Sequence, residues 1–465
     1  MSSPSATGQP PVVAADPAPI GPFSTAVRLG ALFGPAVFGV TAAGVALPKV
    51  AAALHAGPAA VAWVLTAHAL ALGIGTAVFG RLADSWGVRA ALTAGSLVLA
   101  AGAVVCLAAP NLGVLIAGRL VLAAGSGAMT AGGLALLAAV DPAARARVLA
   151  AYGGVMALFA AGATLIGGVT TTWLSWRVTL VLPALSLLAV PLCLRLATRP
   201  GSSRPVDVAG AALLATAAAS LLLLIQAPVL GLPGAVAAVI AAVLVLSSAG
   251  LVWRVRRRAD GFVPRSVVGD AGFWVAAAIG VGVYGGLFAA MYAVPQILAG
   301  THGWSVLAVG AALLPGAAVG AVLSRLAGGL GAGTGRRLLA GAATVTGGIL
   351  AVSGITSGGA FPLVAGTSLA LATFALTQVV LTGEMSVRLP PPLRGAGMGL
   401  LNLAFFVGGG VGSAVAGALA PSMGLSRVLV VVACFPLAAA VLAGCSVGGR
   451  RPFRPGGLRS PGRWD

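Results

Sequence analysis

The sequence predicts an all-α integral membrane protein with fourteen membrane-spanning helices, and three observations support this prediction. The 465 residues are 59% hydrophobic and only 8% charged, with a mean hydropathy of +1.06. A soluble chain of this length carries roughly a quarter charged residues. Apolar runs of about 20 residues recur along the chain, which is the length that crosses a bilayer as a helix. Short clusters of arginine separate these runs, as in loops that set membrane orientation.

Fourteen spans are placed along the chain after an N-terminal tail. Residues 1–24 are rich in Pro, Ala and Ser and are predicted to form a disordered tail before the first span. The spans are placed near residues 28–50, 58–80, 90–109, 112–139, 148–171, 176–197, 207–227, 232–253, 272–298, 305–327, 337–356, 360–383, 395–420 and 427–447.

The charges predict that both termini are cytoplasmic. With the N-terminus inside, most of the 27 Lys and Arg residues fall in inner connections or tails, and only Lys49, Arg177 and Arg427 lie at the outer face. The carboxylates also fall at inner ends, so none is expected near the bilayer centre. Arginine greatly outnumbers lysine and Ala and Gly are abundant, which indicates a GC-rich bacterial genome and hence a bacterial plasma membrane.

A weak internal repeat predicts two related bundles. The stretch GRLADSWGVRAAL (80–92) is followed later by SRLAGGLGAGTGRRLL (324–339), which repeats its arginines and glycine-rich turn without its aspartate. Repeats of this kind are typical of secondary transporters built from homologous halves. We expect six-helix bundles at 25–197 and 267–449, a two-helix insertion with cytoplasmic linkers at 198–266, and a basic cytoplasmic tail at 450–465.

The sequence offers no recognisable enzyme or metal site. It contains no GxxxxGK[ST], HExxH or GxSxG run and no cluster of His and Cys, and its four cysteines lie singly in apolar runs. We therefore expect no catalytic residues, no metal and no cofactor. Although the net charge is +19, the cations flank membrane spans, so no nucleic-acid partner is expected; the lipid bilayer is the expected surrounding.

Six motifs occur in a fixed order: TAAGVALPKVAAAL (41–54), WVLTAHALALG (63–73), GRLADSWGVRAAL (80–92), GRLVLAAGSGA (118–128), SWRVTLVLPA (175–184) and PQILAG (295–300). Together they resemble the major facilitator superfamily, specifically its drug/proton antiporter branch with fourteen spans. Gly80, Asp84, Gly87 and Arg89 match that superfamily's loop between spans two and three, with Ala90 where a second basic residue is usual. The resemblance implies the major facilitator fold, with two six-helix bundles and a two-helix insertion.

The chain departs from the branch at several positions. The branch usually has an acid at the position of Gly39 and an asparagine at that of Gly44. Residues 163–168 read ATLIGG, so that Gly167 and Gly168 of the antiporter motif remain while its Gly-Pro pair is replaced. These departures weaken the inference of proton-driven export and keep an uncoupled transporter open as an alternative.

Two ionisable residues within spans are candidates for the transport site. Arg119 must face protein or water, because a guanidinium at the bilayer centre is costly. It either binds an anionic group or modulates a proton site on the cavity wall, or it bonds the carbonyls of neighbouring helices. His68, where a tyrosine is common in the branch, either carries the coupling proton or packs as a hydrogen-bonded substitute.

The remaining candidates are polar or glycine residues. Glu384 either titrates in the inner vestibule or pairs with Arg388 or Arg394. Each of five uncharged residues is either a cavity contact or an interhelical hydrogen bond: Thr41, Tyr292, Gln296, Thr377 and Gln378. Small residues that pack helices closely are expected at Gly125, Gly127, Gly167 and Gly168.

The leading hypothesis is a monomeric transporter that exports a small amphipathic or hydrophobic compound by alternating access, with protons as the coupling ion. Its conformational latch comprises Gly80, Asp84, Gly87, Arg89 and Arg394, where Asp84 meets an arginine or the positive start of the thirteenth span. The alternatives are a proton-independent facilitator or uptake transporter, and a non-transporting sensor or partner subunit on the same scaffold.

Overall fold

The computed structural model describes residues 21–446, except 199, 203–204, 229, 329, 331, 357–358 and 391–392. Within these residues the chain forms helices and no strands, and fourteen spans are long and apolar enough to cross a membrane. The predicted fold class is therefore confirmed. The basic tail at 450–465 and most of the tail at 1–24 lie outside the described residues, and the first helix already begins at Pro22.

The first bundle contains six spans, of which the first and the sixth are broken by short 3₁₀ segments. Pro35 and Pro183 lie in these segments, where a proline interrupts the α-helical hydrogen-bond ladder. The elements are α1 (Pro22–Phe33), η1 (Gly34–Gly39) and α2 (Thr41–Ala53) in the first span, then α3 (Pro58–Trp86), α4 (Val88–Ala108), α5 (Leu112–Ala138) and α6 (Pro142–Trp173), and finally α7 (Trp176–Val181), η2 (Leu182–Leu185) and α8 (Ser186–Leu194) in the sixth span.

The insertion consists of α9 (Val208–Gln226) and α10 (Gly234–Arg257). Asp207 caps α9 by accepting a hydrogen bond from the Gly210 N–H. The second bundle follows as α11 (Arg265–Val268), α12 (Ala271–Gly300), α13 (Val306–Ala312), α14 (Leu314–Gly328), α15 (Ala332–Ile355), α16 (Ala360–Arg388), α17 (Arg394–Met423), α18 (Leu425–Val432) and α19 (Cys434–Cys445).

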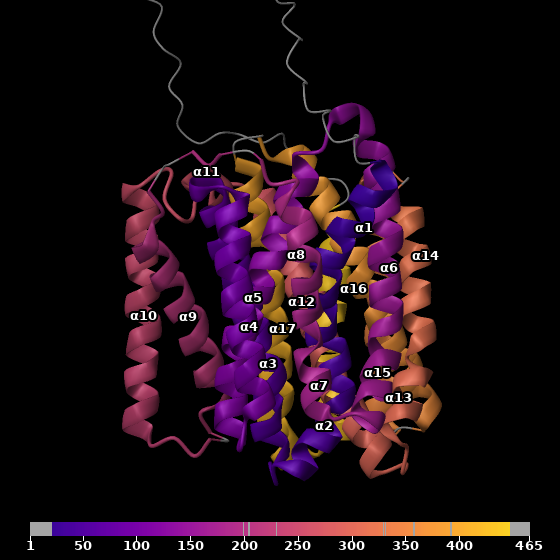
Figure 1. Ribbon diagram of the computed structural model, residues 1–465. Coiled ribbons are helices and arrows are strands. Elements are labelled where there is room, and N and C mark those ends of the chain that lie inside the picture. The colour runs from indigo at the N-terminus through magenta and orange to yellow at the C-terminus, as the bar shows by residue number, and fades with distance from the viewer. Residues whose placement is uncertain are drawn as a thin grey trace, which may run out of the picture.

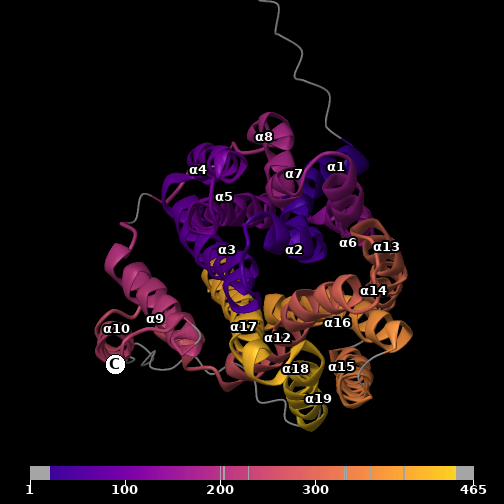
Figure 2. The same ribbon diagram turned by 90° about the horizontal axis from the view of Figure 1, so that it is seen from below.

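The two bundles meet along a seam made by several helix pairs. Seen along the helix axes in Figure 2, α2 and α3 of the first bundle face α12 and α17 of the second. The most extensive contact between the bundles is that of α3 with α17. In addition, α2 packs on α12, and α6 packs on α13 and α14. Because the helices run side by side over their length (Figure 1), the seam extends from one face of the membrane domain to the other.

The insertion lies outside the ring of the two bundles. Helix α9 packs against both α3 and α17, and α10 packs mainly on α9 and is otherwise largely exposed (Figures 1 and 2). Leu70, Ala218, Leu222 and Ala414 form a small apolar cluster at this contact. The insertion therefore contacts the seam from outside, on the helices that both bundles contribute.

The four glycines predicted to pack helices lie at close helix contacts. A Cβ atom at Gly125 would lie 2.3 Å from the Leu99 backbone nitrogen, and one at Gly127 would lie 2.4 Å from that of Thr76. One at Gly167 would lie 2.7 Å from the Ala42 Cα, and one at Gly168 would lie 3.0 Å from the Leu307 Cα. Small residues of this kind allow helices in a membrane to approach closely.

Candidate functional site

A buried arginine ties four helices of the first bundle together. Arg119 lies two turns from the start of α5 and is fully buried. Its Nε donates to the Val64 carbonyl of α3 at 3.3 Å and its Nη1 donates to the Leu180 carbonyl of α7 at 2.9 Å, while its Nη2 donates to the Gly39 carbonyl. Two of these carbonyls lie where the first and sixth spans are broken, so the guanidinium replaces hydrogen bonds that the broken helices lack.

The second candidate, His68, lies directly beside this arginine. Its side chain is fully buried in α3 and packs on Gly39, where a Cβ atom would lie 2.0 Å from the imidazole Nε2. Neither ring nitrogen has a hydrogen-bond partner among the described residues. The imidazole therefore fills the space that a side chain at position 39 would occupy.

The polar candidates of the second bundle bond mostly within their own helices. Thr377 Oγ1 donates to the Thr373 carbonyl at 2.7 Å, and Gln296 Nε2 donates to the Tyr292 carbonyl at 2.5 Å. In the first bundle, Thr41 Oγ1 donates to the Val37 carbonyl at 2.9 Å, across the break in the first span. These three side chains bond backbone carbonyls of their own spans, and none of these hydrogen bonds involves Arg119.

Gln378 makes a contact that sequence reasoning missed, because its Nε2 donates to Asn402 Oδ1 of α17 at 3.3 Å. A second missed contact crosses the seam, where the hydroxyls of Thr66 in α3 and Ser413 in α17 lie 2.8 Å apart. Hydroxyl and amide side chains are common both as cavity contacts and as hydrogen bonds between helices. The only available signal was therefore their occurrence within apolar spans.

One face of the bundle carries the acidic residues, and we call it the carboxylate face; it is defined by Asp84, Asp207, Asp270 and Glu384. Asp84 lies near the end of α3, within 3.4 Å of the position that a Cβ atom would take on Gly395, the second residue of α17. Within the described chain its carboxylate has no hydrogen bond and no ion pair with an arginine. The position of this carboxylate at a helix N-terminus is favourable because the helix dipole is positive there.

The other predicted latch residues surround Asp84 without bonding to its carboxylate. Gly87 adopts a φ of 92° in the turn between α3 and α4, which favours glycine. Gly80 lies one turn earlier in α3, and Arg89 is the second residue of α4. Arg394 begins α17, and its Nε donates to the Leu389 carbonyl at 3.0 Å instead of reaching Asp84.

Linkers of the insertion contact the same end of α3. The Ser202 N–H donates to the Asp84 backbone carbonyl at 2.9 Å. Arg81 donates to the Phe262 carbonyl at 3.2 Å and also to that of Gly261. The insertion is thus hydrogen-bonded to the loop motif at the carboxylate face.

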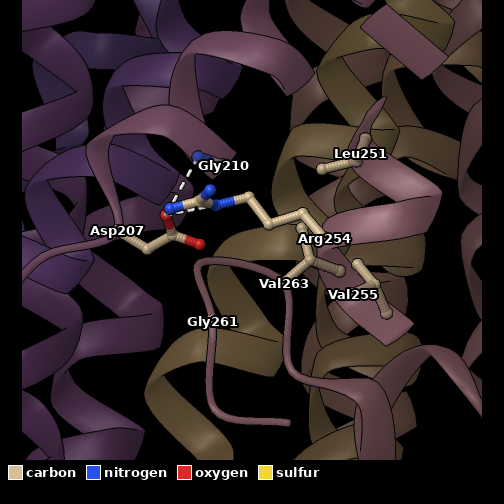
Figure 3. A pocket seen from close by; sticks show the side chains of 7 residues that line it. All are labelled: Asp207, Gly210, Leu251, Arg254, Val255, Gly261 and Val263. Carbon is tan, nitrogen blue, oxygen red and sulfur yellow. Dashed lines mark hydrogen bonds and ion pairs between the residues drawn. The ribbon is translucent and has the colours of Figure 1, made fainter. Parts of the chain in front are cut away.

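Asp207 holds these linkers in place (Figure 3). As Figure 3 shows, its carboxylate accepts from Arg254 Nε at 2.7 Å and from the Gly210 N–H at 3.1 Å. It also accepts from the Phe262 N–H at 3.0 Å. Burial raises the pKa of Asp207, but these hydrogen bonds and the Arg254 charge outweigh it and lower that pKa to about 2. The ion pair is therefore fully formed above about pH 4 and weakens only as the pH falls through about 2.

Two further ion pairs join helices of the second bundle. Glu384 accepts from Arg336 Nε at 2.8 Å and from its Nη2 at 3.0 Å, rather than from Arg388 or Arg394 as the sequence suggested. Arg388 instead donates to Asp270 at the start of α12, at 2.5 Å. Burial raises the pKa of Asp270, but the hydrogen bonds from Arg388 and the Gly272 N–H lower it overall. The pairing differs because Glu384 and Arg388 contact different helices.

Fourteen spans in two bundles, with a buried polar site beside the seam, define a secondary membrane transporter. The chain belongs to the Major Facilitator Superfamily, whose family model matches residues 29–412. This confirms the family that the motifs indicated. It is a multi-pass membrane protein of a family whose members bind small molecules.

Three bacterial proteins illustrate what this chain is similar to. It is 24% identical over 384 residues to the multidrug resistance protein Stp of Mycobacterium tuberculosis, covering 81% of this chain and 71% of that protein. It is 26% identical over 400 residues to the tetracenomycin C resistance and export protein of Streptomyces glaucescens, covering 82% and 73%. A lincomycin resistance protein of Streptomyces lincolnensis is 29% identical over 239 residues, covering 50% and 49%.

Among solved structures, a D-xylose–proton symporter superposes with a TM-score of 0.59 at 15% identity, covering 90% of this chain and 96% of that one. A proton:xylose symporter bound to 6-bromo-6-deoxy-D-glucose gives a TM-score of 0.58 at 14% identity, covering 91% and 95%. At these identities the likeness shows the fold alone.

Replacement of Arg119 is expected to destabilise the whole first bundle. In Arg119→Ala three buried carbonyls lose their donor, and each unpaired group costs roughly 1–3 kcal/mol. We expect the free energy of unfolding in detergent to fall by roughly 3 kcal/mol or more. Arg427→Ala, at an exposed position in α18, is the matched control and should change it by less than about 0.5 kcal/mol. Equal unfolding energies for the two variants would contradict this role of Arg119.

Proposed function

We propose that this protein exports a small amphipathic or hydrophobic compound from a bacterial cell by alternating access, driven by the proton gradient. The observation that carries this proposal is the similarity, over more than four fifths of the chain, to proteins named for multidrug resistance and for tetracenomycin C resistance and export. The chain acts as a monomer, with the carboxylate face and both termini in the cytoplasm. Its arginine-rich connections support this orientation.

In this mechanism the two bundles rock about the seam, and the α3–α17 contact at the carboxylate face acts as a latch. Asp84 stabilises the state in which the start of α17 lies against α3. When the bundles part at this face, that stabilisation is lost, which shifts the balance between the two states. The Thr66–Ser413 hydrogen bond deeper in the seam must also break during the cycle.

His68 is the proposed site of proton binding. The described spans carry no carboxylate in their middle turns, and Arg119 is the charged side chain that acts on the imidazole. Arg119 is already bonded to carbonyls, so a positive charge on His68 is stable only where water or an anion solvates it. Protonation would therefore favour a state in which the site is open to water.

A proton-independent facilitator is the second candidate. The missing acid at Gly39 and the missing Gly-Pro pair before Gly167 favour it, because both belong to positions that the antiporter branch usually fills.

Transport into inside-out vesicles distinguishes these functions. Tetracenomycin C and lincomycin are suitable first compounds, because relatives are named for resistance to them. We expect uptake that requires an imposed pH gradient and is absent from vesicles without the protein. Uptake that is independent of the gradient would indicate a facilitator. If neither compound is taken up, and if expression in a pump-deficient host raises resistance to no drug in a broad screen, export is excluded.

Asp84→Asn is expected to slow transport without affecting membrane insertion. The substitution removes the negative charge at the start of α17 but keeps the size of the side chain. We expect at least a fivefold lower initial rate at an equal amount of protein in the membrane. Asp260→Asn removes an exposed carboxylate near the same face and should leave the rate unchanged. Wild-type rates in Asp84→Asn would exclude the latch.

His68→Gln is expected to abolish the gradient-driven component of transport, because glutamine does not titrate, while exchange without a gradient persists. The pKa of Asp207 is about 2, so this carboxylate stays ionised between pH 5.5 and 8. Asp207→Asn should therefore not change how the transport rate depends on pH in that range. His302→Gln, in the loop after α12, is the matched control.

A double variant tests whether position 39 and His68 share one function. Gly39→Asp combined with His68→Ala places a titratable carboxylate in the same space beside Arg119. We expect it to restore gradient-driven transport in part.

For the single variant, a normal dependence of transport on pH in His68→Gln would exclude His68 as the proton site.

A further inference from the structure

The second bundle contains a closed cluster of aromatic side chains beside the seam. The ring of Tyr284 in α12 has four phenylalanine rings around it, with centroid distances of 4.6 Å to Phe374, 5.1 Å to Phe405, 5.4 Å to Phe406 and 6.4 Å to Phe288. These five residues come from α12, α16 and α17, and we call them the aromatic cage. The Tyr284 side chain is fully buried among them.

Two buried polar atoms beside the cage have no hydrogen-bond partner in the described chain. One is the Tyr284 hydroxyl, and the other is Gln378 Oε1. Gln378 lies one turn after Phe374 on α16, and its Nε2 donates to Asn402, which lies one turn before Phe405 on α17. Gln378 therefore lies on the same face of α16 as Phe374. Other buried polar atoms of the described chain, such as the Tyr152 hydroxyl, also lack a partner, but these two differ from Tyr152 in lying beside an aromatic cluster at the seam, where a ligand could pair with them.

The cage also borders the surface that alternating access must open. The Cβ of Phe406 lies 3.1 Å from the position that a Cβ atom would take on Gly73 of α3, so that the cage contacts the first bundle directly. Phe288 packs in the same way on Gly409 of α17. Separation of α3 from α17 would therefore uncover the cage from the seam.

The charges of the interior restrict what the cage can hold. The described spans place no carboxylate in their middle turns, and Arg119 is a buried cation. Aromatic faces attract cations by about 0.5–2 kcal/mol. Removal of an unpaired cation from water costs several kcal/mol, which is more than such faces return. An uncharged ligand is therefore favoured over an organic cation.

We propose that the aromatic cage binds the transported compound and that this compound is an uncharged aromatic molecule bearing a hydroxyl group. Its ring system stacks on the side of the cage that separation of α3 from α17 uncovers, and its hydroxyl donates to Gln378 Oε1 and accepts from the Tyr284 hydroxyl. This inference rests on the proposed export function, whose substrate class it specifies.

Three probes with one ring system test the predicted class: 1-hydroxypyrene, unsubstituted pyrene and the cation 1-pyrenemethylammonium. Binding to the full chain in lipid nanodiscs is followed by energy transfer from tryptophan to pyrene, with empty nanodiscs correcting for partition into lipid. We expect 1-hydroxypyrene to bind with a Kd at least tenfold lower than that of the cation. Its Kd should be about fivefold lower than that of pyrene, because one hydrogen bond is worth about that factor.

Two variants locate the site in the cage. Tyr284→Phe removes only the hydroxyl and should raise the Kd of 1-hydroxypyrene about fivefold. Phe374→Leu removes one ring and should raise the Kd of all three probes about fivefold. Tyr152→Phe is the matched control, because the Tyr152 hydroxyl is also buried without a partner but lies in α6 of the first bundle. Phe159→Leu controls for loss of a ring outside the cage.

The outcomes separate this inference from the export function. Preferential binding of the cation, no saturable binding of 1-hydroxypyrene, or equal effects of Tyr284→Phe and Tyr152→Phe would each overturn the inference. The comparison of the probes uses the wild-type chain, so it remains decisive if a variant fails to fold. Export itself is tested by the vesicle assay, and gradient-driven uptake there would stand even if the cage bound none of the probes.

Discussion

The first bundle depends on one guanidinium group. In a bilayer no water satisfies a free backbone carbonyl, so a broken membrane helix must find its hydrogen-bond donors within the protein. Arg119 supplies donors to the carbonyls of Gly39 and Leu180, beside the breaks in the first and sixth spans, and to that of Val64 in α3. The same breaks bring Gly39 against His68. The residue that stabilises the bundle is therefore also part of the proposed proton site.

Functional groups of this protein are arranged by depth. The carboxylates lie at one face, where Asp207, Asp270 and Glu384 pair with arginines and Asp84 lies at the start of α17. The middle of the spans holds uncharged polar and aromatic side chains and the basic residue Arg119. The contacts proposed to act as a latch are thus separated from those proposed to hold a compound. The insertion is hydrogen-bonded to the carboxylate face, at the end of α3, through Ser202 and Arg81.

Parts of the site were predictable and parts were not. Arg119 and His68 were identified because charged or titratable residues are rare within apolar spans. Whether Arg119 bonds a ligand or carbonyls could not be read from the sequence, because that depends on helix breaks in two other spans. The partner of Glu384 was wrongly expected to be Arg388 or Arg394, since closeness in sequence does not show which helix lies beside it. Tyr284 and its cage were missed, because aromatic residues in apolar spans carry no polar signal.

The sequence by itself determined the class of protein. Hydropathy gave the number of spans and the ordered motifs indicated the family, because both can be recognised locally along the chain, and the arginine clusters predict the orientation. Only the tertiary structure decided which residues meet across helices: His68 with Gly39, Asp84 with the start of α17, and Tyr284 with four phenylalanines. These contacts depend on how helices distant in sequence are rotated and spaced, which apolar spans of similar composition do not encode locally.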